Sequence, residues 1–594
     1  MNPCYQSSQF HMPPVMRSFG SDMSEDAMAR LERLNSMLKR RGIILPAFEI
    51  HGGAAGMYDF GAIGGRLRNR VNQMWLEHWL SQGDVVEINC PTITPYSVLE
   101  ASGHVGEFSD FLVSCLKCDE ASRADHLLEP HLPHPDSLGK NELSAAIVEY
   151  QPECPSCHEI QWGEVSVQNL MFNTTLGAGS SGRQAFIRPE TAQGMFTNFQ
   201  SLYRHFRQRL PFGAVQIGKG YRNEISPRQG MIRLREFNMA ELEYFIDPEV
   251  KPSHDFSRWK ESVFSLIPDA QEAVSLSIPD ALDGGMIRHP TVAWFMARTA
   301  DLLLKLGIDG KRLRFRQHKG TEMAHYASDC WDAEIEGSYG WVECVGIAHR
   351  GCYDLEAHEN HTGQRLKAWR GWTESVQRNR TVVTIDGATA GPAFRSSAGD
   401  VKQALEELAE VPSTFPFMLK LHDGESVEIL KEHIKVEERH EVINGEWFTP
   451  HVVEPAFGID RIIWHLLDHA WTETEKNGEP YSLLALSPNI APIDVAVLPL
   501  MEKDGMDGLA KKLHLDLCSL SGILSNYDAS GSIGRRYARA DEIGVPWCVT
   551  IDHQSLDDGS ATVRNRDDQE QIRVSVAEIP YLIQSGGISE RFSS

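Results

Sequence analysis

The sequence contains no uninterrupted apolar run near the length of a membrane span, and its start lacks the basic-then-apolar order of a secretion signal. We therefore expect a cytoplasmic protein with no membrane partner. An excess of positive charge is also absent. The 594 residues carry a formal net charge of −25, which argues against indiscriminate nucleic-acid binding, and DNA is not an expected partner. A confined basic surface remains compatible with this charge. We find no internal repeat and no Gly-rich dinucleotide fingerprint.

Without a leader sequence, the eleven cysteines indicate thiols or metal ligands rather than a disulfide framework. Four of them, Cys115, Cys118, Cys154 and Cys157, form two CxxC pairs with 35 residues between the pairs. Thiolates at such spacing can close a tetrahedral Zn²⁺ site, which would stabilise the loop-rich insertion expected over about 115–160. Free thiols are the alternative, because the intervening stretch exceeds the usual zinc-ribbon length. Histidines could also compete as ligands: His126, His131, His134 and His158.

Periodicity along the chain predicts the local structure. Residues 1–22 are polar and unpatterned, which indicates a flexible tail. Ser24 is the expected N-cap of a helix that ends at Gly42, and a second helix is expected over 67–80, followed by a strand in DVVEIN. We further expect mainly helix from about 250 to 320, a second insertion of mixed character over about 365–445, and an α/β domain from about 490.

Two period-2 runs joined by Ser-Pro-Arg-Gln-Gly predict a long antiparallel hairpin. Arg222 and Glu224 lie two apart on its first strand, and Arg233, Arg235 and Phe237 alternate along the second. Guanidinium, carboxylate and aromatic groups would then share one face. An Arg fork suits phosphate and an aromatic ring suits a purine, although a solvated hairpin with cross-strand ion pairs explains the local pattern equally well.

Downstream, EPAFGIDRIIWHLL places Glu454 and Arg461 on either side of a Gly458 turn that opens an apolar helix. YRNE with REF behind it is similar to motif 2 of class II aminoacyl-tRNA synthetases, and GIDR before a helix resembles motif 3. Longer blocks from about residue 40 to 465 resemble glycyl-tRNA synthetases of the dimeric, archaeal and eukaryotic type. These blocks are SGHVGEFSDF, RADHLLE, IRPETAQGMF, RNEISPRQGMIRLREFNMAELEYF, WVECVGIAHRGCYDL and HVVEPAFGIDR.

The resemblance implies an α+β fold, with a class II catalytic domain over 23–485 built on an antiparallel sheet packed with helices. The insertions at about 115–160 and 365–445 would interrupt this domain, and an α/β anticodon-binding domain would follow over 486–594. The segment ending at Pro95 would be motif 1, which in this class builds the interface of a homodimer. The implied substrates and partners are glycine, ATP and tRNA(Gly).

For ATP, the resemblance implies two catalytic arginines, Arg222 at the α-phosphate and Arg461 at the γ-phosphate. Glu224 would read the adenine edge while Phe237 stacks on its face. Mg²⁺ is expected between the phosphates, with Glu343 as its protein ligand. The full implied set is Arg222, Asn223, Glu224, Ile232, Arg233, Leu234, Arg235, Glu236, Phe237, Glu343, Cys344, Gly458, Ile459, Asp460 and Arg461.

Glycine has no side chain, so recognition must fall on its ammonium and carboxylate, and larger amino acids must be excluded sterically. The resemblance implies three carboxylates around the ammonium and two arginines beside them, and converging like charges are costly unless a cation completes them. Structural ion pairs are the alternative reading of Glu190 and Glu241. The implied set is Arg123, Glu190, Phe237, Glu241, Arg350, Glu454, Ala456 and Gly458.

Two positions depart from the family pattern. Ala456 stands where the family usually has Ser, which removes one possible hydrogen bond to substrate, typically about 1 kcal/mol. His349 stands where the common residue is acidic or amide-bearing, and no consequence follows from the sequence alone.

The implied mechanism depends on charge stabilisation. The glycine carboxylate attacks the α-phosphorus in line, pyrophosphate leaves, and the 3′-OH of the terminal adenosine of tRNA then attacks the adenylate carbonyl. In the C-terminal domain, Arg535, Arg536 and Arg539 are the expected tRNA contacts, unless they pair with Asp541 and Glu542. Two other functions stay open: a non-catalytic synthetase-derived nucleic-acid-binding protein, and a ligase that adenylates an amino acid but charges something other than tRNA.

Overall fold

The computed structural model describes residues 25–594, apart from residues 133–134, 226, 228–229, 270, 320–328, 409, 423, 477 and 594. The predicted tail over 1–22, the predicted cap Ser24 and the alternative zinc ligand His134 lie outside the described residues. The chain divides into two compact units, residues 1–366 together with 450–594, and residues 367–449. Within the described ranges, no helix is both long enough and apolar enough to cross a bilayer.

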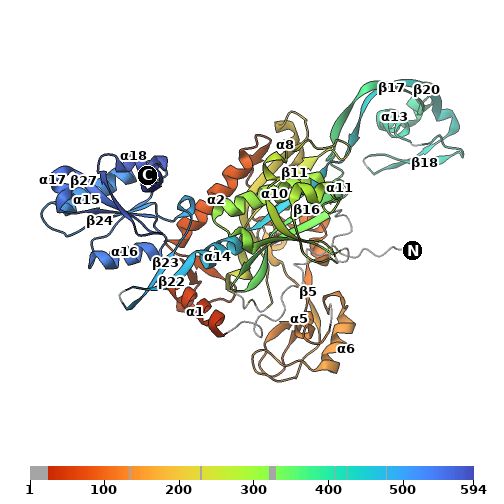
Figure 1. The fold of residues 1–594 in the computed structure, drawn as a ribbon. Helices are drawn as coiled ribbons and strands as arrows, with labels where there is room; N and C mark the ends of the chain where they lie inside the picture. The colour runs from red at the N-terminus through yellow and green to blue at the C-terminus, as the bar shows by residue number, and fades with distance from the viewer. Residues whose placement is uncertain are drawn as a thin grey trace. The chain divides into compact units, whose positions relative to one another are not determined.

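A nine-stranded sheet, as far as the chain is described, organises the larger unit (Figure 1). Its strands are β3 (Val85–Glu87), β10 (Phe212–Tyr221), β11 (Glu236–Ile246), β12 (Val263–Ile267), β13 (Val274–Ser277), β14 (Leu313–Gln317), β15 (Asp329–Gly337), β16 (Gly340–Gly351) and β21 (His451–Gly458). In space they follow the order β13-β12-β14-β15-β16-β21-β11-β10-β3. Neighbours are antiparallel except for the parallel pairs β3–β10 and β12–β14.

The two faces of this sheet differ because side chains alternate along each strand. On β11, Ala240, Leu242 and Tyr244 belong to the main hydrophobic core. The helices that contribute to the same core include α2 (Gly64–Leu80), α10 (Pro290–Leu306) and α14 (Ile459–Ala470). The alternate residues Glu241 and Glu243 lie on the opposite face, although both are buried. Buried carboxylates are costly, so their presence on one face of a central strand indicates a functional site there.

The early helices agree with the sequence pattern. Helix α1 (Glu25–Arg40) ends just before Gly42, whose φ of 63° is the left-handed conformation that glycine adopts without strain. Helix α2 covers the predicted helix over 67–80, and β3 lies within the predicted strand DVVEIN.

The predicted hairpin is confirmed, but its strands are shorter than expected. β10 and β11 pair antiparallel from Phe212↔Phe245 to Tyr221↔Glu236. Arg222, Glu224, Arg233 and Arg235 therefore lie in the connecting segment rather than on the strands. The chain leaves the ladder because its amides find other acceptors: Asn223 N–H donates to the Leu170 carbonyl at 2.7 Å, and Arg235 N–H donates to the Gly56 carbonyl at 2.8 Å.

The prediction of mainly helix over 250–320 is wrong in part. Helix α10 is present, with α9 (Ile278–Asp283) before it, but three edge strands of the main sheet, β12, β13 and β14, also lie in this region. Each is four or five residues long. Such short runs cannot be assigned by periodicity alone, because partner strands decide their conformation.

The cysteine-bearing insertion is more ordered than a loop-rich segment. A three-stranded sheet in the order β6-β5-β7 supports it, formed by β5 (Ser109–Ser114), β6 (Ala121–Arg123) and β7 (Ser166–Asn169). Two helices, α5 (Ala124–Leu128) and α6 (Lys140–Tyr150), pack on a small core that includes Val113 and Leu143. The scattered His and Pro residues obscured this helical content in the sequence.

Residues 367–449 form the second unit, at the position of the predicted second insertion. A long antiparallel pair, β17 (Ala368–Ile385) and β20 (Ile434–Phe448), carries a small lobe. The lobe contains α12 (Gly387–Phe394), α13 (Ala398–Glu406), β18 (Phe417–Lys420) and β19 (Ser426–Ile429) around its own hydrophobic cluster.

The C-terminal region is an α/β domain, as predicted. Its five strands, in the order β25-β24-β26-β27-β28, are β24 (Val495–Pro499), β25 (Ser525–Tyr527), β26 (Trp547–Ile551), β27 (Ser560–Asn565) and β28 (Gln571–Ser575). Its helices are α15 (Met506–Cys518), α16 (Ile533–Glu542), α17 (His553–Asp558), α18 (Ile579–Ser585) and α19 (Ile588–Ser593).

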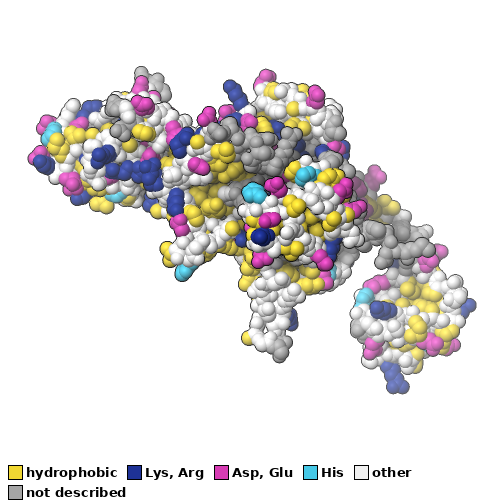
Figure 2. Space-filling view, turned by 90° about the horizontal axis from the view of Figure 1, so that it is seen from below, with side chains coloured by type: hydrophobic (Ala, Val, Ile, Leu, Met, Phe, Trp, Pro, Cys, Tyr) yellow, Lys and Arg dark blue, Asp and Glu magenta, His cyan; other side chains and the backbone are white. Residues whose placement is uncertain are grey.

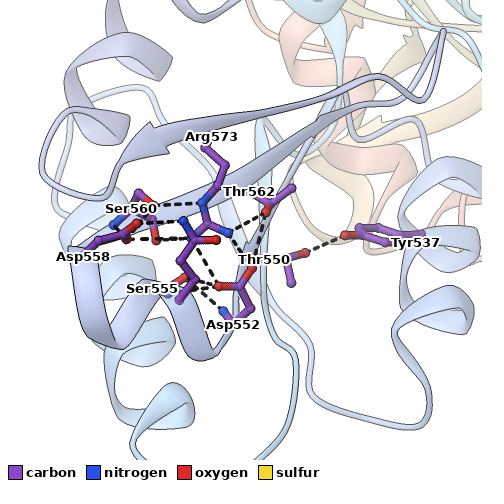
Figure 3. A network of polar contacts seen from close by, with 9 residues as sticks. Tyr537, Thr550, Asp552, Ser555, Asp558, Ser560, Thr562 and Arg573 are labelled. Carbon is purple, nitrogen blue, oxygen red and sulfur yellow. Dashed lines mark hydrogen bonds and ion pairs between the residues drawn. The ribbon is translucent and has the colours of Figure 1, made fainter.

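A polar network fixes the turn after β26 in this domain (Figure 3). The Asp552 carboxylate accepts the Ser555 N–H at 3.0 Å, which caps α17, and Arg573 of β28 donates to the same carboxylate at 2.7 Å.

The remaining elements connect or flank these parts. They are β1 (Ile44–Pro46), β2 (Tyr58–Phe60), β4 (Ile93–Pro95), α3 (Tyr96–Ala101), α4 (His104–Glu107), β8 (Phe172–Leu176), β9 (Arg183–Ile187), α7 (Ala192–Thr197), α8 (Phe199–His205), α11 (Tyr353–Thr362), β22 (Trp471–Lys476) and β23 (Glu479–Leu484).

Candidate active site

A cavity of about 140 Å³ lies on the polar face of the main sheet. Strands β11, β16 and β21 supply its floor, and the segment between β10 and β11 supplies one wall. The predicted residues that line it are Glu190, Arg222, Glu224, Ile232, Arg233, Leu234, Phe237, Glu241, Glu343, Cys344, Glu454, Ala456, Gly458, Asp460 and Arg461. The structure therefore brings together residues from segments up to 271 positions apart, counted from Glu190 to Arg461.

At one end of the cavity, Arg222 lies between two aromatic rings. Its guanidinium carbon is 5.2 Å from the ring centre of Phe108 and 5.5 Å from that of Phe237. Gly220 allows the Phe237 ring to lie against the backbone of β10, because a Cβ at this position would come within 2.6 Å of the ring. The two rings restrain the guanidinium and leave its N–H groups available for an anionic ligand.

The connecting segment orients a carboxylate beside Arg222. The Glu224 carboxylate is buried and lies 3.7 Å from Arg233 Nε. Arg235 Nε donates to the Glu224 carbonyl at 3.2 Å, and Arg235 Nη1 donates to the Ala55 carbonyl at 3.1 Å. Arg235 thus holds the backbone of the segment and does not line the cavity.

Arg461 enters the cavity from the first turn of α14. Its Nη1 donates to the Glu343 carbonyl at 2.7 Å, and its Nε donates to the Ile232 carbonyl at 3.1 Å. Burial and the neighbouring Asp332 raise the pKa of Glu343 to about 7, against the lowering effect of Arg461. Glu343 is only partly exposed and Asp332 is buried, and the Asp332 carboxylate already pairs with Arg316 at 2.8 Å and His318 at 2.8 Å. Carboxylate oxygens are the ligands that a divalent cation such as Mg²⁺ prefers, and such a cation would favour the ionised form of Glu343.

Asp460 fastens α14 to β11. Its carboxylate accepts the Asn238 N–H at 2.7 Å and the Asn238 side-chain amide at 2.8 Å. Burial raises the pKa of Asp460 to about 6, while these hydrogen bonds lower it. Asp460 therefore positions Arg461, its neighbour on the helix, and Phe237, the neighbour of Asn238 on the strand.

Carboxylates gather at the other end of the cavity. The antiparallel register pairs Glu241 of β11 with Ala456 of β21, and Ala456 with Gly346 of β16, so these three residues share one face. The Glu241 carboxylate accepts the Thr191 N–H at 2.8 Å and also accepts the Thr191 hydroxyl. The chain after β9 brings Glu190 to the same place, where its carboxylate accepts the Gln193 amide at 2.9 Å.

One arginine compensates part of this negative charge. Arg350 Nη1 donates to the Glu454 carboxylate at 2.7 Å, and its Nε and Nη2 donate to both oxygens of Asp354 at 2.8 and 2.9 Å. All three side chains are buried. Arg350 does not line the cavity itself, but it orients Glu454, which does.

Burial and mutual repulsion control protonation in this cluster. Burial, Glu454 and Glu190 raise the pKa of Glu241 to about 8. Burial also raises the pKa of Glu454, against the effect of Arg350. Burial acts in the same direction on Glu190, but His104, 3.3 Å away, together with Arg350 lowers its pKa below the usual range. Some of the carboxyl groups in the pocket therefore remain protonated until a cation enters.

Some predicted residues lie outside the cavity. Arg123 pairs with Asp110 at 2.9 Å and Asp125 at 2.6 Å on the insertion sheet. Glu236 forms an ion pair with Lys219, and Ile459 is fully buried in the core. Asn223 does not line the cavity either. The lining of the cavity therefore does not include Arg123, Asn223, Glu236 or Ile459.

Other lining or supporting residues escaped the sequence analysis. His104 lies within the quoted block SGHVGEFSDF, and Gln193 lies within IRPETAQGMF, but neither was singled out. Glu243 is two residues beyond Glu241 on the same strand, so the period of two was the available signal. The remaining missed lining residues are Met231, Asn238, Met239, His318, Cys330, Asp332, Gly346, Ala348 and Phe457.

His349 belongs to a histidine cluster on the sheet face opposite to Arg350. Its ring stacks on His289 at 4.5 Å between ring centres, and its Nε2 is 3.3 Å from His451 Nδ1. Burial and these two neighbours lower the pKa of His349 to about 3. A residue of acidic or amide type at this position would meet the two imidazoles with a hydrogen-bond acceptor instead of a third ring.

The four CxxC cysteines converge in the insertion. Cys115 Sγ is 3.6 Å from Cys157 Sγ, and Cys118 Sγ is 3.7 Å from Cys154 Sγ. All four sulfur atoms lie within 4.8 Å of one another. A tetrahedron with Zn–S bonds near 2.3 Å has sulfur atoms about 3.8 Å apart, so the set fits Zn²⁺. The described histidines nearby do not belong to the group. His158 lies beside Glu153, and His131 stacks on Tyr150.

The three arginines of α16 have different surroundings. Arg536 is buried and donates to the carbonyls of Pro499 and Gly531, so it supports the fold. Arg539 pairs with Asp528 at 2.6 Å, whereas Arg535 is exposed. The alternative partners are occupied otherwise: Asp541 pairs with Arg564 and Glu542 with Arg40 and Arg41. On the C-terminal domain, at the left of Figure 2, a few lysine and arginine side chains lie together, with acidic side chains around them.

Comparison with known proteins agrees with this geometry. A family model described as the tRNA synthetase class II core domain (G, H, P, S and T) matches residues 178–390, and one described as the anticodon binding domain matches residues 494–585. The predicted fold class, a class II catalytic domain followed by an α/β anticodon-binding domain, is confirmed.

Curated relatives match along almost the whole chain. The chain is 46% identical over 552 residues to the glycine–tRNA ligase of Methanothrix thermoacetophila, which covers 92% of this chain and 95% of that protein. It is 43% identical to the glycine–tRNA ligase of Methanocaldococcus jannaschii (92% and 97% covered) and 40% identical to that of Archaeoglobus fulgidus (93% and 96%). The chain therefore belongs to the glycine–tRNA ligase family of class II aminoacyl-tRNA synthetases.

Proposed function

We propose that the cavity on the polar face of the main sheet is where this glycine–tRNA ligase joins glycine to ATP, before transfer of glycine to tRNA(Gly). The observation that carries the proposal is the polarity of the cavity. Restrained arginines line one end and a carboxylate cluster lines the other, on adjacent strands of one rigid sheet. An anionic nucleotide and an ammonium group therefore have complementary places within a single site.

The nucleotide occupies the arginine end. Arg222 contacts the α-phosphate, Arg461 contacts the terminal phosphate, and Glu224 accepts a hydrogen bond from the adenine amino group while Phe237 stacks on the base. Glu343, with Asp332 beside it, would hold Mg²⁺ against the phosphates, and the ion supplies charge neutralisation there. Because burial and Asp332 raise the pKa of Glu343 to about 7, a divalent cation favours its ionised form.

Glycine occupies the carboxylate end. Its ammonium donates to Glu190, Glu241 and Glu454, and this replaces the missing countercharge of the cluster. Ala456 and Gly346 lie directly on the floor, and their small side chains leave room for glycine while β11, β16 and β21 enclose it. The glycine carboxylate then points toward Arg222 and the α-phosphate, which is the geometry of in-line attack.

Arg222 stabilises charge on the α-phosphoryl oxygens as the bond to glycine forms and pyrophosphate leaves past Arg461. No side-chain nucleophile is required. The 3′-OH of the terminal adenosine of tRNA then attacks the adenylate carbonyl and releases AMP. Exposed Arg535 on α16 is proposed to contact the tRNA.

Three further assignments complete the proposal. Zn²⁺ bound by Cys115, Cys118, Cys154 and Cys157 holds the insertion together, as the sulfur distances support. The protein acts as a homodimer through the segment that ends at Pro95, and it works in the cytoplasm.

Glycine-dependent exchange of labelled pyrophosphate into ATP, followed by charging of tRNA(Gly), tests the function. Wild-type protein should support both reactions. Arg222→Ala should reduce exchange by at least a hundredfold, the size of effect seen when one charge-stabilising donor is removed from an active site. Arg535→Ala is the matched control, because it should leave exchange unchanged and weaken only charging. Exchange without charging by the wild type would indicate a ligase with another acceptor, and absence of exchange would overturn the proposal.

A further inference from the structure

Glu243 is a buried carboxyl group that the proposed reaction does not use. It lies on β11 two residues after Glu241, so both side chains are on the polar face of the sheet. Its side chain is fully buried. Neither of its carboxylate oxygens accepts a hydrogen bond within the described part of the chain. An ionised carboxylate in this state would lack both a counter-ion and a donor, which buried groups rarely tolerate.

A matching acceptor lies beside it. Glu454 Oε1 is also buried and receives no hydrogen bond from the described residues, although the other oxygen of Glu454 receives one from Arg350 at 2.7 Å. One oxygen each of Glu241, Glu243 and Glu454 lies within 4.8 Å of the others. Within this group of three carboxyl groups, Glu243, which has no hydrogen-bond donor on either oxygen, therefore lies next to Glu454, which has none on Oε1.

Arg350 is the cation that acts on Glu243, but it has other partners. Arg350 already pairs with Glu454 and with both oxygens of Asp354. Burial, Glu454, Glu241 and Asp354 all favour the neutral form and raise the pKa of Glu243 well above its usual value, and Arg350 opposes them only in part. A neutral carboxyl group has one O–H donor, which is what Glu454 Oε1 lacks.

We propose that Glu243 is a positioning residue: its buried carboxyl group keeps a proton and donates it in a hydrogen bond to Glu454 Oε1. With Arg350 on one oxygen and Glu243 on the other, Glu454 stays ionised and fixed in the orientation that receives the glycine ammonium. The effect on glycine binding rests on the proposed function, but the protonated state of Glu243 can be measured separately.

Two substitutions with side chains of similar length distinguish the loss of the hydrogen-bond donor from a change in side-chain volume. Glu243→Gln keeps a neutral side chain with an N–H donor, so the KM for glycine should stay within about twofold of wild type. Glu243→Met fills similar space without a donor, so the KM for glycine should rise about ten- to a hundredfold, as expected when a hydrogen bond to a charged group is lost. The KM for ATP should be unchanged in both variants, because the nucleotide end of the cavity is not touched.

The pyrophosphate exchange assay gives these constants, and thermal unfolding monitors the fold of each variant. Equally large increases of the glycine KM in Glu243→Gln and Glu243→Met would overturn the proposal, because the ionised carboxylate would then be the functional form. Wild-type KM in the Met variant would overturn it as well, since no donor would be needed.

An infrared difference spectrum of wild type minus Glu243→Gln at pH 9 provides a readout that does not depend on activity. At this pH the Glu241 carboxyl group is mostly ionised. The carbonyl stretch of a protonated carboxylic acid should therefore appear in the wild type and disappear in the variant. Absence of this band would refute the protonated state. A band that is present in a protein without glycine-dependent exchange would refute the proposed function and leave the protonation assignment intact.

Discussion

Glycine binding should release protons, because the empty pocket holds a proton on Glu241 that the glycine ammonium displaces. Burial, Glu454 and Glu190 raise the pKa of Glu241 to about 8 in the free protein. An ammonium group between these carboxylates favours the ionised form and so lowers that pKa. A group whose pKa falls on binding opposes binding at low pH, and this cost disappears as the pH rises through the pKa of the free state.

The magnitude follows from the pKa. With a value of about 8, neutral Glu241 exceeds the ionised form about tenfold at pH 7 and equals it at pH 8. The KM for glycine should therefore fall about fivefold between pH 7 and pH 8 and about twofold more above pH 8. Glycine binding at pH 7 should release about 0.9 proton per site. The raised pKa of Glu454 makes the dependence on pH steeper.

Isothermal titration of glycine at pH 7 in two buffers with different ionisation enthalpies measures proton release directly. The KM for glycine at saturating ATP, measured between pH 6.5 and 8.5, provides the second readout. Glu241→Gln removes the titrating group and keeps an acceptor for Thr191, so its glycine KM should be higher but less dependent on pH. Zero proton release together with a flat wild-type KM profile would refute the reasoning.

Three further outcomes are expected. Metal analysis should find one Zn²⁺ per chain. The double variant Cys118→Ser, Cys157→Ser should bind no zinc, and its insertion should become sensitive to protease. Equal zinc content in wild type and variant would reject the four-sulfur site. Ala456→Ser should lower the glycine KM about fivefold, equivalent to about 1 kcal/mol. Its register partner is Gly346, where the nearest atom would be 3.9 Å from an added Cβ, so there is space for a hydroxyl. An unchanged or higher KM would show that the hydroxyl finds no partner. Between pH 7.5 and pH 5, the free energy of unfolding should fall by about 2 kcal/mol less in His349→Asn than in wild type. The reason is that folded His349 stays neutral, with a pKa of about 3, while the unfolded chain takes up the proton near pH 6.5. Thermal midpoints that fall equally in wild type and variant would contradict this.

The sequence predicted those parts of the fold that have a strong local signal. Helices α1 and α2 follow an apolar periodicity over 16 and 17 residues, and the β10–β11 hairpin follows an alternation on both sides of one turn. Strands β12, β13 and β14 were missed because each has at most five residues and is defined by its partners in the sheet. Helix α6 was missed because His and Pro residues before it resemble a loop.

The sequence identified the residues of the candidate site that belong to a recognisable motif. It missed the residues that reach the site only through the folding of the chain. Arg222, Glu224 and Arg461 carry their own sequence context and line the cavity. Arg123 and Glu236 were included through resemblance, but ion pairs hold them outside it. Asp332 and His104 have no distinctive local pattern, because strand register brings Asp332 to the site and the separate helix α4 brings His104. For Glu243, the period of two from Glu241 was the one local signal.

A crystal structure with a non-hydrolysable analogue of glycyl-adenylate tests the central claim most directly, because it shows both ends of the cavity at once. We predict that the analogue's ammonium lies within hydrogen-bond distance of Glu190, Glu241 and Glu454, and its adenine on Phe237. Arg222 should contact the group that replaces the α-phosphate. An analogue bound elsewhere, or one whose ammonium points away from the three carboxylates, would contradict the account.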